Sequence, residues 1–153
     1  MMDNHNVEVL LLAHQLEKAL AELYAVFIER YTTYRSLWTH LLHEEQGHAE
    51  VLRKLYQLTY EKKSFFDAGA IKPAAIQTVI DHVKELSDSA ARGLMSETQA
   101  LKVTHDLESS IFEKDLFTHF KVAAEYGDLL KQVIEEDRAH IQMVKKALQT
   151  HPG

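Results

Sequence analysis

The sequence predicts an all-α protein, built as an antiparallel four-helix bundle with one long crossover that carries a short extra helix. Three observations support this prediction. The 153 residues include only two prolines and five glycines, so few positions interrupt a helix. Apolar residues recur every three or four positions, as on the buried face of a helix. Breaks in this pattern separate two pairs of long helices.

The first pair is expected over about residues 7–30 and 37–60. Ser36 suits the N-cap of the second helix. Because the connection between the two helices is short, they should lie antiparallel. The apolar face of the first helix shows the helical spacing through Leu12, Leu16, Leu20, Leu23 and Phe27.

The second pair follows a long connection. Gly69 and Pro73 break the pattern, and residues 74–87 are expected to form a separate helix along the crossover. Ser96 and Gln99 have the spacing of a capping box, which starts a helix that should continue to about Lys121. A last helix is expected over about residues 128–149, with Asp128 at its N-cap. Residues 1–153 are expected to form one domain.

Composition excludes several functions. The net charge of -6 argues against a nucleic-acid partner, because phosphate binding needs a basic face. The absence of cysteine excludes disulfides, thiolate metal sites and cysteine nucleophiles, and it suits a cytoplasmic location. The N-terminal segment is predicted to be neither a signal peptide nor a membrane span, so no membrane partner is expected. Ten histidines are a first, weak hint of metal chemistry.

Four polar positions recur between the two halves of the chain. Their register is kept within one residue across two helices and a loop, which predicts a duplicated helical hairpin. The positions in the first half are matched 91 or 92 residues later, so that His14, Glu17, Glu45 and His48 correspond to His105, Glu108, Asp137 and His140.

The helical spacing turns the acids of this repeat toward the core. A buried, unpaired carboxylate costs several kcal/mol. Two divalent cations would cancel the charges of four acids, with two histidines binding as neutral imidazoles. The i, i+3 spacing allows an acid and a histidine of one helix to bind the same ion. The candidate metal ligands are therefore Glu17, Glu45, His48, Glu108, Asp137 and His140.

Some assignments stay open at this point. Glu22 competes with Glu17, and Glu136 competes with Asp137 because its i, i+4 spacing to His140 also permits ligation. The internal repeat favours Glu17 and Asp137. Two histidines of the repeat either orient the neighbouring carboxylates or lie at the edge of the bundle: His14 and His105. The remaining histidines are expected at the surface or edge: His5, His40, His43, His82, His119 and His151.

This ligand set resembles that of the ferritin-like di-iron carboxylate proteins, and the sequence resembles their rubrerythrin branch. The similarity extends over nearly the whole chain, through "EKALAELY", "WTHLLHEEQGHAEVLRKL" and "LKQVIEEDRAHIQMV". It implies two iron ions, with manganese or zinc as substitutes. By this resemblance Glu45 and Asp137 lie between the metals, Glu17 and Glu108 bind as terminal or bridging carboxylates, and each histidine binds one metal. Tyr24, seven residues after Glu17, would lie beside the ligands of the opposite half.

The chain departs from the family pattern in three ways. Asp137 replaces the usual glutamate, and Ile111 occupies the position of a further glutamate in rubrerythrins. The rubredoxin-like electron-transfer module is missing because the chain has no cysteine. A separate electron donor, such as a rubredoxin-like protein, is therefore expected.

The expected function is that of a di-iron oxidoreductase of the peroxidase or ferroxidase type, which reacts Fe(II) with O2 or peroxide and serves against oxidative stress. The resemblance also implies a homodimer. Two alternatives stay open: an iron-binding or sequestering protein without catalysis, and a helical interaction module without metal.

Overall fold

The computed structural model describes residues 3–109 and 111–151, with side chains throughout except at positions 111–114. Helices account for most of the described residues, so the all-α prediction is confirmed. The side chain at position 111, where the sequence departs from the rubrerythrin pattern, lies outside the described residues. Among the residues described, no helix has both the length and the apolar character needed to cross a bilayer.

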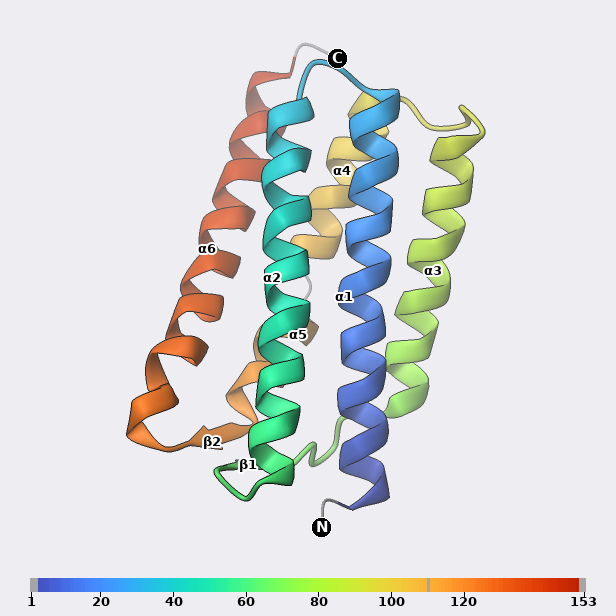
Figure 1. Ribbon diagram of the computed structural model, residues 1–153. Coiled ribbons are helices and arrows are strands. Elements are labelled where there is room, and N and C mark those ends of the chain that lie inside the picture. The colour runs from blue at the N-terminus through green and yellow to red at the C-terminus, as the bar shows by residue number, and fades with distance from the viewer. Residues whose placement is uncertain (1–2, 110, 152–153) are drawn as a thin grey trace.

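Long helices run alternately up and down the molecule (Figure 1). α1 packs against α2 and α3, while α6 packs against α4 and α2. α4 and α5 follow each other along one direction and face α6, which runs back (Figure 1). The helices are α1 (Asn4–Arg30), α2 (Arg35–Tyr60), α3 (Pro73–Ala91), α4 (Glu97–Glu108), α5 (Ile111–Thr118) and α6 (Gly127–Thr150).

Side chains and proline mark several helix starts. Asp3 accepts hydrogen bonds from the backbone N–H groups of His5 and Asn6 at the start of α1. The predicted capping box at the start of α4 is confirmed: Ser96 and Gln99 each accept the other's backbone N–H through the side-chain oxygen, at 3.2 and 2.8 Å. α3 starts with Pro73, whose missing N–H is not needed there.

Two predicted caps are wrong. Ser36 lies inside α2, which starts at Arg35 after Tyr34 without a side-chain cap. Asp128 lies in the first turn of α6 rather than at its N-cap, which is Tyr126. An acid in the first turn still stabilises the helix because it faces the positive end of the helix dipole.

The predicted single helix over residues 96–121 is also wrong in its second half. α4 ends at Glu108, α5 starts at Ile111, and β2 (Phe120–Val122) follows. β2 pairs antiparallel with β1 (Ser64–Phe66), which lies just after α2. The rings of Phe66 and Phe120 are buried and 4.5 Å apart. This small sheet joins the end of α2 to the end of α5, and so fixes one end of the molecule.

α3 lies along the outside of α1 and is longer than predicted (Figure 1). At the other end of the molecule, Phe27, Tyr31 and Trp38 form an aromatic cluster with ring centroids 5.3–5.7 Å apart. The buried indole N–H of Trp38 donates to Thr104 Oγ1 at 3.1 Å. This hydrogen bond ties α2 to α4, the two helices that carry Glu45 and Glu108.

Candidate metal centre

All six predicted ligands are buried. They lie on four helices: Glu17 on α1, Glu45 and His48 on α2, Glu108 at the end of α4, and Asp137 and His140 on α6. Their exposed fractions are 8% or less: Glu17 2%, Glu45 0%, His48 1%, Glu108 8%, Asp137 5% and His140 1%. On each of these helices, the face that periodicity predicts to be buried is buried.

The buried side chains form two overlapping donor groups. Glu17, Glu45 and His48 have ligand atoms within 4.8 Å of one another, and so do Glu45, Glu108 and His140. Glu45 belongs to both groups and lies between them. Asp137 lies next to the first group, with its Oδ1 3.8 Å from His48 Nδ1. Five of the six predicted ligands thus belong to a group of three side chains that could hold one ion. The sixth, Asp137, lies beside the first of these groups.

Distances in both groups suit a shared ion better than a hydrogen bond. His48 Nδ1 lies 3.8 Å from Glu45 Oε2, and His140 Nδ1 lies 3.8 Å from Glu108 Oε2. Hydrogen bonds of this kind are shorter than about 3.2 Å. Two atoms each about 2.1 Å from one ion are about 3.0–4.2 Å apart when the angle at the ion is 90–180°. The spacing leaves room for a cation between each histidine and its carboxylate.

The charges also suit divalent ions. Four carboxylates are buried within this region, and burial of uncompensated charge is costly. The ion pairs described for lysine and arginine side chains lie at the surface, at Glu50, Glu61 and Asp88. A donor set of carboxylate oxygens and imidazole nitrogens fits iron, manganese or zinc.

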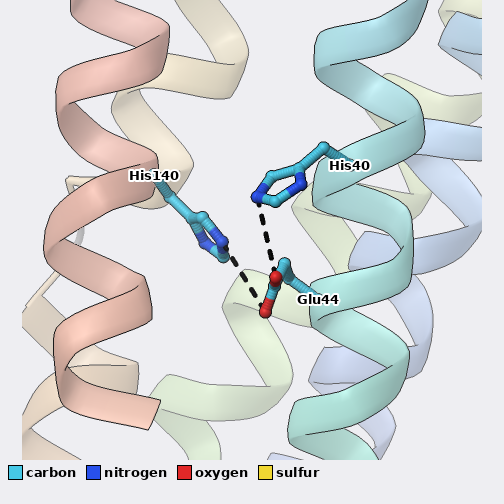
Figure 2. Close-up of side chains that lie close together, drawn as sticks. All are labelled: His40, Glu44 and His140. Atoms are coloured by element: carbon cyan, nitrogen blue, oxygen red, sulfur yellow. Dashed lines mark ion pairs between the residues drawn. The ribbon is translucent and has the colours of Figure 1, made fainter. Parts of the chain in front are cut away.

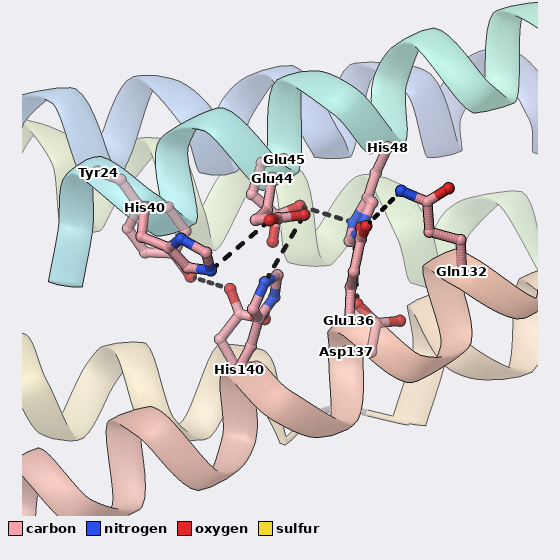
Figure 3. A network of polar contacts seen from close by, with 10 residues as sticks. Tyr24, His40, Glu44, Glu45, His48, Gln132, Glu136, Asp137 and His140 are labelled. Carbon is pink, nitrogen blue, oxygen red and sulfur yellow. Dashed lines mark hydrogen bonds and ion pairs between the residues drawn. The ribbon is translucent and has the colours of Figure 1, made fainter.

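The two histidines present Nδ1 to the inner groups and Nε2 to a second layer of acids (Figure 3). His48 Nε2 lies 3.1 Å from Glu136 Oε2, and His140 Nε2 lies 4.0 Å from Glu44 Oε2. A carboxylate on the second nitrogen fixes the ring orientation of a metal-binding histidine. Each histidine therefore faces an acid of the opposite helix, α6 for His48 and α2 for His140.

Glu44 and Glu136 influence each other's ionisation. Partial burial and the neighbouring Glu136 carboxylate raise the pKa of Glu44. Partial burial would also raise the pKa of Glu136, but hydrogen bonds from Glu44, Gln132 and His48 outweigh it and lower that pKa. Two carboxylates this close are therefore not ionised equally easily.

Tyr24 has the position that the resemblance implies. Its buried hydroxyl donates a 2.7 Å hydrogen bond to Glu108 Oε1, a candidate ligand of the opposite half. Burial alone would raise the pKa of Glu108, but His140, Glu45 and Tyr24 together lower it below its usual value. Glu108 is thus held as an anion, the form that binds metal.

The structure also bears on the alternatives. Glu22 is exposed whereas Glu17 is buried, so Glu17 is the better candidate. Glu136 is 26% exposed and meets the outer nitrogen of His48, whereas Asp137 is buried on the inner side. His14 lines a pocket beside Glu17. His105 lies near Ser109 and Asp106, at 3.5 and 3.9 Å.

Sequence reasoning missed two participants. Glu44 lies off the main apolar stripe, and His40 was placed among the surface histidines. His40 Nε2 lies 3.6 Å from Glu44 Oε1, and its ring packs edge-on against His140 with centroids 5.6 Å apart. The repeat did contain a signal for Glu44, because Glu44 and Glu136 are themselves 92 residues apart.

A pocket of about 530 Å³ opens between α1 and α2. Its lining includes the candidate ligand Glu17 and two small side chains beside it, Ala21 and Ala49. Polar side chains line the remainder, among them His14, Gln46 and Arg53. The pocket gives small solutes an approach to Glu17 on the side of the molecule formed by α1 and α2.

No protein-family model, no curated protein and no solved structure matches this chain.

Proposed function

We propose that this chain is a ferritin-like protein of the rubrerythrin type, and that its centre holds two iron ions that react with O2 or peroxide. In this proposal α1, α2, α4–α5 and α6 are the four helices of the bundle, and α3 lies on the crossover. The observation that supports it most is the pair of buried carboxylate–histidine groups that share Glu45.

In this proposal each candidate ligand has a defined position relative to the two ions. Glu45 would bind between them, because it belongs to both donor groups. Glu17 and His48 would complete one side, and Glu108 and His140 the other. Asp137, which lies beside His48, would supply a further oxygen. The bound iron would supply the redox chemistry, since carboxylate and imidazole ligands support both Fe(II) and Fe(III).

Neighbouring residues would keep these ligands in place. Tyr24 fixes one oxygen of Glu108 and leaves the other toward His140. Glu136 fixes the ring of His48 through Nε2, so that Nδ1 points inward. The pocket beside Glu17 would admit a small oxidant and exclude larger molecules. Reducing equivalents would come from a separate donor protein.

The test is an anaerobic Fe(II) titration of the metal-free chain, compared with two variants. Glu45→Gln should bind fewer Fe(II) ions per chain than wild type, because both donor groups lose their shared acid. Glu50→Gln is the matched control, since Glu50 lies on the same helix with its side chain 67% exposed and forms a surface ion pair with Arg53. Equal iron binding by wild type and Glu45→Gln would exclude the proposed centre.

Iron binding without catalysis is the second candidate, and Asp137 favours it. Asp137 has a shorter side chain than the usual glutamate and belongs to neither three-residue donor group. Oxidant consumption at substoichiometric iron separates the two functions. Continued consumption with a reductant indicates an enzyme, whereas oxidation that ends once the added iron is oxidised indicates a binding protein.

A further inference from the structure

A third group of metal-binding side chains lies outside the inner centre, where α2 faces α6. His40 and Glu44 come from α2, and His140 comes from α6 (Figure 2). Their ligand atoms lie within 4.8 Å of one another. The side chains of His40 and Glu44 are 46% and 24% exposed, whereas that of His140 is 1% exposed. The group therefore connects solvent to the buried histidine.

The outer nitrogen of His140 points to a ligand at this position. His140 Nε2 is buried and makes no hydrogen bond to any residue that the structure describes. Its nearest acid, Glu44 Oε2, lies 4.0 Å away, which is too long for a hydrogen bond. A buried nitrogen left without a partner is costly, by about 1–3 kcal/mol. A cation between His140 and Glu44 would satisfy it.

The equivalent position in the other half of the repeat, around Glu136, has hydrogen bonds where the outer group has longer distances. There Gln132 takes the place of His40, 92 residues later in the sequence. Its amide donates to Glu136 Oε1 at 2.9 Å, while His48 Nε2 lies 3.1 Å from Glu136 Oε2. Both oxygens of Glu136 therefore have hydrogen-bonding neighbours. At Glu44 the corresponding distances are 3.6 Å to His40 and 4.0 Å to His140, which are long enough to admit an ion.

We propose that His40, Glu44 and His140 form an outer binding site for a divalent first-row transition-metal ion. Two imidazole nitrogens and a carboxylate favour Zn²⁺, Co²⁺ or Fe²⁺ over Mg²⁺ and Ca²⁺, which prefer oxygen. The separations of 3.6 and 4.0 Å suit two atoms bound to one ion at about 2.1 Å each. The exposed His40 lets the ion enter directly from solvent.

His140 belongs to both the outer and the inner site, so the two compete. A neutral imidazole has one nitrogen lone pair available, because the other nitrogen carries a proton. His140 can therefore bind the ion beside Glu108 through Nδ1 or the outer ion through Nε2, but not both. The outer site is then an alternative position for that ion. This competition depends on the proposed inner centre, whereas the outer site does not.

The test uses Co²⁺ and variants in which the inner centre is disabled. Glu45→Gln removes the shared inner acid and should still bind one Co²⁺ per chain, seen in the visible spectrum and by equilibrium dialysis. Adding His40→Ala should weaken this ion about tenfold or more. Adding His43→Ala instead is the matched control, because His43 is an exposed histidine of the same helix, and it should change nothing.

Two outcomes would overturn the outer site: no Co²⁺ binding by Glu45→Gln, or equal binding by the His40→Ala and His43→Ala forms. Glu45→Ala serves as a second background if Glu45→Gln does not fold. Failure of the proposed inner centre looks different. In that case wild type and Glu45→Gln bind the same number of ions, and adding His40→Ala still lowers that number.

Discussion

Tyr24→Phe removes one hydrogen-bond donor from the candidate centre and little else. The phenol oxygen lies 2.7 Å from Glu108 Oε1, and both side chains are buried. Phenylalanine keeps the ring that packs against Phe27 with centroids 6.3 Å apart. A hydrogen bond to a charged group contributes about 1.5–3 kcal/mol to the free energy of unfolding. For a chain of this size, that loss lowers Tm by about 3–12 °C.

The assay is thermal unfolding of the metal-free protein at pH 7, followed by circular dichroism. A double-mutant cycle with Glu108→Gln isolates the interaction. In the Glu108→Gln background the acceptor is neutral, so Tyr24→Phe should cost only about 0.5–1.5 kcal/mol. Tyr60→Phe is the control, because Tyr60 is 73% exposed, and its Tm should equal that of the wild type.

Two results would refute this account of Tyr24. Tyr24→Phe could melt at the wild-type temperature, in which case the hydrogen bond contributes nothing. Alternatively, it could cost the same free energy with glutamate or glutamine at position 108, in which case the loss comes from packing. If the centre holds metal as proposed, saturating Fe(II) or Zn²⁺ should reduce the cost, because the ion then shares the charge of Glu108.

Three further predictions follow from the same contacts. Thr104→Val removes the acceptor of the Trp38 indole and should lower the free energy of unfolding by about 1–3 kcal/mol, measured by denaturant unfolding with fluorescence of this single tryptophan. Ala21→Phe should fill the pocket beside Glu17 and slow Fe(II) oxidation in stopped flow without changing iron stoichiometry. The stability advantage of metal-free wild type over Glu108→Gln should be complete above the usual pKa near 4.5 and disappear as pH falls through the lowered pKa of Glu108.

Periodicity predicted most of the helical fold because long amphipathic helices repeat their signal over many turns. The break after Glu108 could not be predicted this way. Residues near it still carry apolar side chains at helical spacing, and the chain leaves the helix to form β2. A three-residue strand such as Phe120–Val122 has too few alternations to show a pattern. Its pairing with Ser64–Phe66 is also a contact between distant parts of the sequence.

In the candidate site, too, the features set within one helix were predicted and the contacts between helices were not. The direction in which Glu17, Glu45 and His48 point is a property of each helix, and the sequence predicted it. The contacts of Glu136 with His48 and of His40 with His140 run between α2 and α6. Such contacts depend on how two helices pack against each other. The spacing of residues within one helix does not predict that packing. Half-buried residues at the margin of an apolar face are therefore the ones that sequence reasoning missed.

The two halves of the repeat do not build two equal halves of the centre. The first donor group takes all its members from α1 and α2, whereas the second needs Glu45 from α2 as well as Glu108 and His140. Asp137, the counterpart of Glu45, has one methylene fewer and belongs to neither group. Asp137 therefore does not take the shared position in the second half that Glu45 takes in the first. This asymmetry makes α2 the helix on which both groups depend, since Glu45 is the acid that they share.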